Sequence, residues 1–197
     1  MDEHDSHQFD FELPNVGRGG ETVQCCELFA DSDSLLVVLL GSHYCSRSRE
    51  LVRALSERND AFRRRATTVV PVLPDIRERA RLWDRQYDLP FPMLVDPATD
   101  GDSEPASERD DTDTFETFGP LQQSVASLPA VALCRPEDDG LRVVATATEA
   151  EQDVPVVESL LGFLDRHRTA DATSTGNTPV DSRSGRRRAP RRPRGPL

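Results

Sequence analysis

The chain has four cysteines, and one of them, Cys45, stands where an α/β protein often places a reactive group. It follows the apolar run Leu35–Leu40 and the short loop Gly41–Tyr44, and it precedes a segment with helical periodicity. Functional sites form at the carboxyl ends of strands in such folds. A helix N-terminus also carries unpaired N–H groups and a partial positive charge, which stabilise a thiolate. The position of Cys45 therefore predicts a nucleophilic thiol; the alternative is a half-buried cysteine without chemistry.

Polar residues on both sides of Cys45 could tune this thiol. Arg47 and Arg49 lie in the first turn of the expected helix, where cationic side chains stabilise a thiolate. His43 lies two residues before the cysteine. A histidine in such a loop is either a general base or an ordinary hydrogen-bonding residue, and the sequence leaves both open.

The other three cysteines have simpler explanations. Cys134 ends an apolar run and is expected to be a small core residue. Cys25 and Cys26 are adjacent, so at most one of them is expected to face the core. They could act as a redox pair, although a disulfide between neighbouring cysteines is strained.

The elements that must position Cys45 begin with Leu35–Leu40, a continuous apolar run that predicts a strand buried on both faces. Ser46–Arg65 has apolar residues at helical spacing and predicts one amphipathic helix of about five turns. Thr67–Leu73 predicts a second strand, in which Pro71 suggests a strand end or a bulge. Asp75 could then cap a helix that runs to about Tyr87.

The second half of the chain predicts three more strands and a final helix. Phe91–Val95 is a short strand, and residues 115–125 form a short helical connection. Pro129–Cys134 and Leu141–Thr146 form a hairpin with a six-residue connection that contains Asp-Gly. Val154–His167 is the last helix. The order of these elements predicts a three-layer α/β fold, with a parallel sheet and an antiparallel hairpin at one edge.

Charge divides the chain into parts. All 24 basic residues are Arg, no Lys is present, and 35 acidic residues give a net charge of −11. This composition is expected of a GC-rich organism with an extremely salty cytoplasm, because salt screens the self-repulsion of a highly charged protein. Residues 1–168 carry a net charge of −16, whereas residues 169–197 carry +5.

These differences suggest domain boundaries. We predict a flexible acidic N-terminus over residues 1–8, one domain over 9–168 with an acidic surface insertion at 100–113, and a disordered Arg/Pro-rich tail over 169–197. The tail is either a nucleic-acid-binding arm or a solvated extension. The extension is favoured, because salt weakens binding to phosphate steeply, so nucleic acid is not an expected partner.

The sequence also argues against several classes of site and location. The longest apolar run has six residues, against roughly 18 for a membrane span, and no secretory signal precedes the domain. The acidic insertion lacks the glycine-centred spacing of a calcium loop. We therefore predict a cytoplasmic protein without a membrane span, a cofactor or a metal site.

Four stretches of the chain resemble the peroxiredoxin-like branch of the alkyl hydroperoxide reductase and thiol-specific antioxidant (AhpC/TSA) family, which has a thioredoxin fold. In chain order they are FELPNVGRGGETVQCCELFA, LLVVLLGSHYCSRSRELVRAL, VVPVLPDIRERARLWDRQYDLPFPMLVDP and SLPAVALC. Together they cover most of residues 9–168. The resemblance implies a thioredoxin-like three-layer sandwich with a mixed central sheet, a terminal β-hairpin and a C-terminal helix.

The resemblance also implies a mechanism and roles for individual residues. A thiolate attacks the O–O bond of a peroxide and becomes a sulfenic acid, which a second thiol resolves to a disulfide. By position, Cys45 would be the peroxidatic cysteine and Ser42 the hydroxyl that holds the peroxide. Pro129 would be the proline, usually cis, that precedes the penultimate strand.

The chain departs from the family pattern at several places near Cys45. Val38 stands where the family usually has Pro, and Leu40 stands where many members carry Arg before the loop glycine. The second cysteine of Cys-Pro-x-Cys is Ser48, and position 50, where another branch keeps a resolving cysteine, is Glu50. The catalytic Arg expected near Pro129 is missing, so Arg47 or Arg135 would have to replace it electrostatically.

These departures leave three possibilities for the chemistry of Cys45. It could be a one-cysteine enzyme resolved by an external thiol, either a thioredoxin-like protein or a low-molecular-weight thiol. Cys25 or Cys26 could resolve it from the preceding loop, or the fold could persist with little peroxidase activity.

We predict a thiol-dependent oxidoreductase that reduces hydrogen or alkyl peroxides, with a homodimer as a possible assembly. The alternative is a thioredoxin-fold monothiol redox or binding protein without peroxidase activity.

Overall fold

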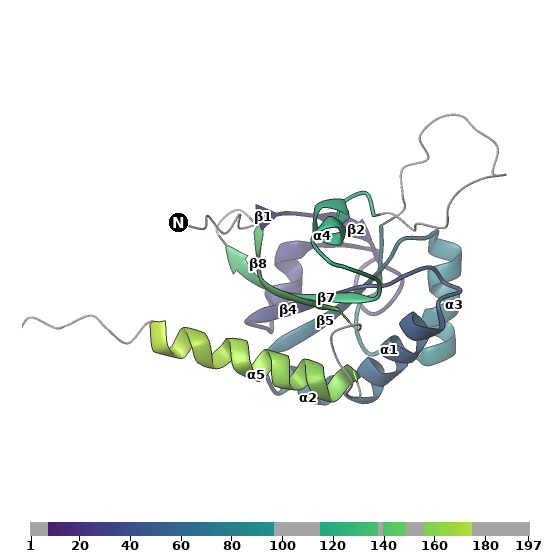
Figure 1. Cartoon of the computed structure of the whole chain (residues 1–197). Helices are drawn as coiled ribbons and strands as arrows, with labels where there is room; N and C mark the ends of the chain where they lie inside the picture. Colours follow the sequence, from purple (N-terminus) through teal and green to yellow (C-terminus); the bar gives the residue numbers. More distant parts are fainter. Residues whose placement is uncertain (1–7, 97–114, 138–139, 149–155, 175–197) are drawn as a thin grey trace, which may run out of the picture.

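A mixed six-stranded sheet forms the middle of the computed structural model, which describes residues 8–96, 115–137, 140–148 and 156–174 (Figure 1). The strand order is β1-β8-β7-β4-β5-β6. Strands β4, β5 and β6 run parallel, while β7, β8 and β1 add antiparallel neighbours on the other side of β4. The strands are β1 (Gln8–Phe9), β4 (Ser34–Leu39), β5 (Thr67–Leu73), β6 (Leu94–Val95), β7 (Ala130–Glu137) and β8 (Gly140–Thr148).

Strand β4 lies at the centre because both of its faces are apolar. All six residues are buried, and the strand pairs with β5 on one side and β7 on the other. Pro71 sits inside β5 without ending it, which corrects the expected strand end or bulge. The carbonyl of Val72 accepts the N–H of Leu40, the residue after β4, and the carbonyl of Leu73 accepts the N–H of Asp96, the residue after β6. Successive residues of β5 therefore direct their backbone polar groups to opposite neighbouring strands. The backbone nitrogen of Pro71 therefore faces the β6 side, where the two residues of β6 pair only with Val72 and Leu73.

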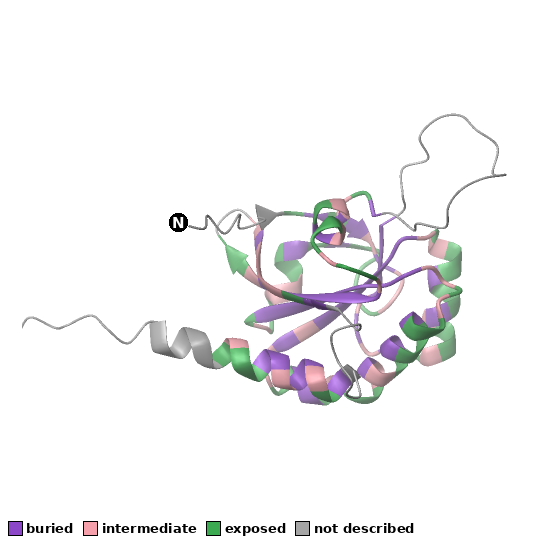
Figure 2. Ribbon diagram, in the orientation of Figure 1, coloured by how far each residue is buried: buried purple, intermediate pink, exposed green. Residues whose placement is uncertain are grey.

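Helices cover one face of the sheet. They are α1 (Ser46–Glu57), α2 (Asn59–Arg63), α3 (Arg77–Tyr87) and α5 (Val156–Ser174). Their apolar residues pack with alternate residues of β4, such as Leu36 and Val38, in one core cluster. The single helix predicted over 46–65 is wrong, because the backbone leaves helical geometry at Arg58, with φ −109° and ψ 10°. Figure 2 shows these helices buried toward the sheet and exposed on their outer sides.

The opposite face of the sheet is covered by smaller elements. They are the β2–β3 hairpin (Glu12–Pro14 and Thr22–Gln24), the 3-10 helix η1 (Cys25–Phe29) and α4 (Gly119–Gln123). They pack on the other alternate residues of β4, such as Leu35 and Val37. The three-layer α/β class, the mixed sheet, the terminal hairpin and the C-terminal helix are therefore confirmed.

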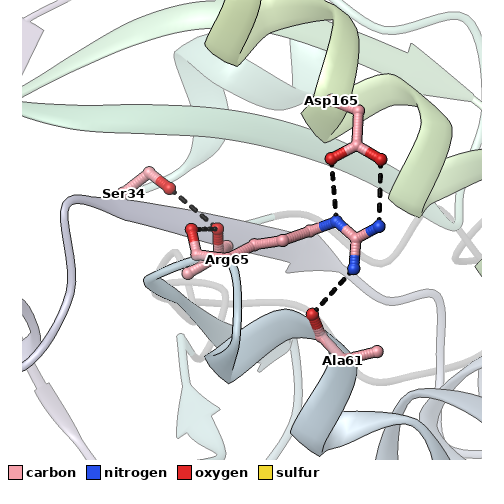
Figure 3. Close-up of polar contacts among 5 residues, drawn as sticks. Ser34, Ala61, Arg65 and Asp165 are labelled. Carbon is pink, nitrogen blue, oxygen red and sulfur yellow. Dashed lines mark hydrogen bonds and ion pairs between the residues drawn. The ribbon is translucent and has the colours of Figure 1, made fainter.

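An ion pair and several hydrogen bonds connect α5 with the rest of the fold (Figure 3). Arg65 Nε and Nη2 donate to the two carboxylate oxygens of Asp165, each at 2.9 Å, and Nη1 donates to Ala61 O at 3.1 Å. Thr67 Oγ1 donates to Arg65 O at 3.3 Å and lies 3.0 Å from Ser34 Oγ. These contacts connect α5 with the end of α2 and the start of strands β4 and β5.

Several predicted boundaries need correction. The hairpin is tighter than predicted, because Glu137 pairs with Gly140, and β6 covers only part of the predicted strand. Helix α5 covers Val156–Ser174, so it begins two residues later than predicted and continues past the predicted end at His167. The predicted insertion at 100–113, most of the N-terminal segment and residues 175–197 of the tail lie outside the described residues. Among the described helices, none is long and apolar enough to cross a membrane.

Candidate functional site around Cys45

Cys45 is the residue at which the chain turns from the central strand into helix α1. Its backbone is extended, with φ −65° and ψ 114°, and it occupies the N-cap position of the helix. Its N–H donates to Ser42 O at 2.9 Å, which closes a turn, and its carbonyl accepts the N–H of Arg49 at 3.2 Å. The thiol is free and half-buried. It therefore lies beside the first N–H groups of α1, which have no partner inside the helix.

Gly41 and Ser48 are the residues adjacent to the Cys45 thiol on its buried side. Gly41 N–H donates to Ser48 Oγ at 2.9 Å, and Ser48 is fully buried. A Cβ on Gly41 would lie 3.5 Å from both Cys45 Sγ and Ser48 Oγ. The thiol and the hydroxyl thus both lie close to the α-carbon of Gly41. Sequence reasoning had named Ser48 only as a missing cysteine, so this structural role is new.

His43 connects the Cys45 loop with the loop that follows β5. Its Nδ1 contacts Oδ2 of Asp75, whose carboxylate is almost completely buried, with 7% of the side chain exposed. Asp75 Oδ1 also accepts the N–H of Ile76 at 2.7 Å and pairs with Arg79 Nη1 at 3.1 Å. Asp75 was expected to cap α3, but the N-cap residue is Ile76 and Asp75 lies one residue earlier.

The other predicted polar residues lie around the loop. Ser42 is half-buried and provides the carbonyl that closes the turn to Cys45. Arg47 is exposed in the first turn of α1, where its guanidinium pairs with no carboxylate of the described residues. Arg49 Nη2 donates to Tyr44 O at 3.5 Å, and the Tyr44 side chain is 76% exposed.

Pro129 lies at the same edge of the sheet as Cys45. The Leu128–Pro129 peptide bond is cis, and Pro129 is buried. The next residue, Ala130, pairs with Leu39 at the end of β4. Pro129 is therefore beside the chain as it enters the Gly41 loop. Arg135 lies at the other end of β7, where it faces Arg142 and donates to His167 O at 3.3 Å, so it does not replace the missing arginine near Cys45.

Cys25 and Cys26 lie at the opposite end of the central strand. They line a cavity of about 670 Å³ together with Asp10, Glu12 and Glu137. Cys25 and Cys26 share this cavity with Pro136, Glu137 and Gly140, at the end of β7 far from the pair Leu39–Ala130, whereas Cys45 follows the Leu39 end of β4. At about 3.3 Å per residue, the rise from Leu35 to Leu40 alone is about 16 Å, whereas a disulfide needs Cα atoms about 4.4–6.8 Å apart. The fold does not bring either cysteine to Cys45.

Burial also makes the protonation of the cysteine thiols differ. Burial, together with a hydrogen bond of 2.8 Å from Cys25 Sγ to Asp10 Oδ1, raises the pKa of Cys25 to about 11. Cys134 is fully buried, as expected of a core residue, and burial raises its pKa to about 12. Cys26 is exposed. A thiol with so high a pKa is almost entirely protonated at neutral pH, so Cys25 and Cys134 are poor nucleophiles.

Two further features lie away from the thiol. A cavity of about 730 Å³ opens beside the start of β5, lined in part by Asp60, Arg63 and Arg64, at the end of the sheet opposite to Cys45. Within residues 8–96, 115–137, 140–148 and 156–174, no group of three or more His, Cys, Asp and Glu side chains could hold a metal ion.

Comparison with known proteins gives a match to one family model. The family model described as AhpC/TSA family matches residues 6–103, a range that contains Cys25, Cys26 and Cys45. A comparison with curated protein sequences gave no match.

Solved structures of thioredoxin-fold proteins superpose on the chain. A yeast mitochondrial 1-Cys peroxiredoxin is 14% identical with a TM-score of 0.61, and the match covers 92% of this chain and 85% of that one. Peroxidoxin BcpB from Mycobacterium tuberculosis is 12% identical with a TM-score of 0.57, covering 82% and 96%. A candidate thiol:disulfide interchange protein, DsbE, from Chlorobium tepidum is 16% identical with a TM-score of 0.52, covering 84% and 95%. At these identities the likeness concerns the fold.

Proposed function

Because the chain belongs to the AhpC/TSA family, and thus to the thiol-dependent oxidoreductases, we propose that it reduces hydrogen or alkyl peroxides through Cys45. The observation that carries this proposal is the position of the Cys45 thiol, half-buried at the N-cap of α1 and packed over Gly41. Dipoles at a helix N-terminus favour a thiolate, which is the form that attacks a peroxide.

In the proposed reaction, the Cys45 thiolate attacks one peroxide oxygen and the O–O bond breaks. The sulfur is oxidised by two electrons to a sulfenic acid, and the departing oxygen takes a proton to leave as water or an alcohol. We assign to Ser42 the hydrogen bond that orients the peroxide and to Arg47 the cationic stabilisation of the thiolate. We also assign a structural role at the site to Pro129, because the next residue, Ala130, pairs with Leu39 at the end of β4.

The sulfenic acid then needs a second thiol. An external thiol attacks the sulfur and releases water, which forms a mixed disulfide, and a second external thiol frees Cys45. The length of β4 separates Cys25 and Cys26 from Cys45, and Ser48 stands where a local Cys-x-x-Cys pair would have its second cysteine. Both observations support resolution by an external thiol. We propose a thioredoxin-like protein or a low-molecular-weight thiol as this reductant.

One observation favours a second candidate function. The arginine expected near Pro129 is missing, and Arg135 lies at the far end of β7. A peroxide would then have less cationic stabilisation as its O–O bond breaks. The second candidate is therefore a monothiol redox protein that exchanges mixed disulfides through Cys45 without turning over peroxide.

A peroxide-consumption assay with dithiothreitol distinguishes the two candidates. We expect turnover by the wild type, its loss in Cys45→Ser, and normal turnover in Cys26→Ser, which removes an exposed thiol at the other end of the sheet. Trapping with dimedone followed by mass spectrometry should place the sulfenic acid on Cys45. Mixed disulfides on Cys45 without peroxide consumption would support the second candidate, and peroxide consumption by Cys45→Ser would refute both.

A further inference from the structure

A cavity of about 730 Å³ lies beside the start of β5, at the end of the sheet opposite to Cys45. Strand β6 pairs only with Val72 and Leu73, which are the last residues of β5. Within the described part of the chain, the start of β5 therefore has no strand on that side, and the cavity occupies this place. Its volume is in the range of roughly 300–1,000 Å³ that is common for small-molecule sites.

Helix α2 presents one polar face to this cavity. Residues four positions apart lie on the same side of a helix. Two such pairs line the cavity: Asn59 with Arg63, and Asp60 with Arg64. Phe62 is fully buried in the core cluster that α2 shares with the sheet. The helix is thus fixed by its apolar side, while its polar side is available to a ligand.

Two arginines of this segment have no partner for their charge. Four arginines lie in or next to α2, and Arg58 and Arg65 pair with carboxylates of α5, as Figure 3 shows for Arg65. The side chains of Arg63 and Arg64 make no ion pair or hydrogen bond with any described residue. Acidic residues outnumber arginines by 35 to 24 in this chain, so two unpaired guanidinium groups beside one cavity are a local exception. The cavity therefore offers two free cations.

Two uncharged side chains add further donors. Asn59 and Thr68 are half-buried and line the same cavity, and neither side chain has a hydrogen-bond partner among the described residues. Each guanidinium carries several N–H donors, the amide carries an NH₂ group and the hydroxyl carries one proton. A phosphate oxygen only accepts hydrogen bonds when it is ionised, and arginine binds phosphate through paired N–H groups. The donors around the cavity therefore fit a phosphate group.

The remaining lining limits what the phosphate is attached to. Asp31 and Asp60 are exposed at the cavity and have no ion-pair partner among the described residues. Carboxylates repel a bare phosphate but accept hydrogen bonds from hydroxyl groups. The half-buried rings of Pro90 and Pro92 add an apolar wall. This combination favours a ligand with a phosphate at one end and a hydroxylated carbon skeleton at the other.

We propose that this cavity binds a phosphate monoester of a sugar, which is either a free sugar phosphate or a mononucleotide. Arg63 and Arg64 hold the phosphate, and Asn59 and Thr68 donate further hydrogen bonds to it. The two carboxylates accept hydrogen bonds from the sugar hydroxyls. Since the cavity and the reactive thiol lie at opposite ends of the sheet, this binding is independent of the proposed peroxide chemistry.

Isothermal titration calorimetry of the full chain tests the proposal, with ribose 5-phosphate, adenosine monophosphate and inorganic phosphate as ligands. At about 0.1 M KCl, where exposed charges act over roughly 10 Å, we expect saturable binding of one sugar phosphate per chain. Inorganic phosphate should bind about tenfold more weakly, because it brings no sugar hydroxyls to the carboxylates. Tighter binding of adenosine monophosphate would assign the site to a nucleotide, and tighter binding of ribose 5-phosphate to a free sugar phosphate.

Variants of the lining residues show where the ligand binds. Arg63→Gln and Arg64→Gln should each weaken binding of ribose 5-phosphate about tenfold, because each removes a charged donor. Thr68→Val keeps the shape of the side chain and should weaken it about fivefold. Asp31→Ala should reduce the preference for ribose 5-phosphate over inorganic phosphate. Arg81→Gln removes an exposed arginine of α3 outside the cavity lining and is the matched control, with unchanged affinity.

The two arginines are exposed and unpaired, so their variants should melt like the wild type when no ligand is present. Absence of saturable binding by both sugar phosphates would overturn the proposal. Equal weakening by Arg81→Gln and Arg63→Gln would also overturn it, because it would indicate a general attraction of phosphate to arginines. Equal affinities for inorganic phosphate and both sugar phosphates would refute the proposed ligand class.

Discussion

The hydroxyl oxygen of Ser48 accepts the backbone N–H of Gly41 at 2.9 Å, across the base of the loop that carries Cys45. Ser48 is the third residue of α1, and Gly41 is the second residue after strand β4. A single buried hydrogen bond thus connects the first turn of the helix with the entrance of the loop, directly beneath the thiol. The residue that stands in place of a second cysteine supports the loop instead of taking part in a disulfide.

Ser48→Ala should destabilise the protein. The substitution leaves the buried Gly41 N–H without an acceptor, which costs about 1–3 kcal/mol. For a domain of this size we expect the melting temperature to fall by about 3–9 °C. Ser46→Ala, at an exposed position two residues earlier, is the matched control and should melt close to the wild type. Equal melting temperatures for Ser48→Ala and the wild type would contradict this role of Ser48.

Two of the four cysteines should react with iodoacetamide at pH 7 in the folded protein. With a pKa of about 11, Cys25 is a thiolate in roughly one molecule in ten thousand at that pH, and Cys134, with a pKa of about 12, even less often. Modification should therefore be confined to Cys26 and Cys45, as counted by intact mass and located by peptide mapping. Because both pKa values are raised, the reactivity of Cys25 and Cys134 should increase only under strongly alkaline conditions. In denaturant all four cysteines should react, and early labelling of Cys25 in the folded state would contradict the burial described here.

Gly17→Ala should weaken the packing of the segment after β2 against the segment before β6. A Cβ at this position would lie 2.6 Å from Phe91 O and 2.8 Å from Met93 N, both backbone atoms that cannot move aside alone. Forcing an extra methyl group into such a site costs about 1–3 kcal/mol, which chemical denaturation can measure. Gly119→Ala provides the control, because nothing lies within 4 Å of the added carbon. Similar stabilities for the two variants would rule out the tight contact at Gly17.

The ion pair between Arg65 and Asp165 should stabilise the protein at neutral pH and lose this effect in acid. The hydrogen bonds from Arg65 hold the pKa of Asp165 below its ordinary value. A depressed carboxyl pKa stabilises the folded state above the unfolded pKa of about 3.9, and the stabilisation disappears as pH falls through the lower folded value. Asp165 is half exposed, so we expect about 0.5–1 kcal/mol at pH 7.

The comparison of Asp165→Asn with the wild type measures this contribution by urea denaturation at pH 7 and at pH 3. The difference in free energy of unfolding should be present at pH 7 and smaller at pH 3. Glu50→Gln removes an exposed carboxylate of α1 and should show no such difference. A difference for Asp165→Asn that is larger at pH 3 than at pH 7 would refute the assignment.

Much of the local structure could be predicted from the sequence alone. The run Leu35–Leu40 is apolar at every position, and only a strand covered on both faces buries such a run, so β4 had to be central. The place of Cys45 after that strand and before a helix followed from the same pattern. Cys134 was expected in the core because its neighbours are apolar, and it is fully buried.

Contacts between segments could not be predicted in the same way. His43 and Asp75 are brought together by the parallel pairing of β4 and β5, and Ser48 meets Gly41 because α1 folds back over its own loop. Arg135 was a candidate near Cys45, but the register of β7 against β4 places it at the other end of the sheet.

The sequence by itself thus determined which residues form the central strand, that Cys45 stands between this strand and a helix, and which cysteine is core, because burial and periodicity depend on near neighbours. The tertiary structure alone decided which thiols can meet and which charges surround Cys45. Strand register sets those distances, and register depends on the packing of the whole sheet. Cys25 and Cys26 are close to Cys45 in sequence, yet the length of β4 keeps them apart.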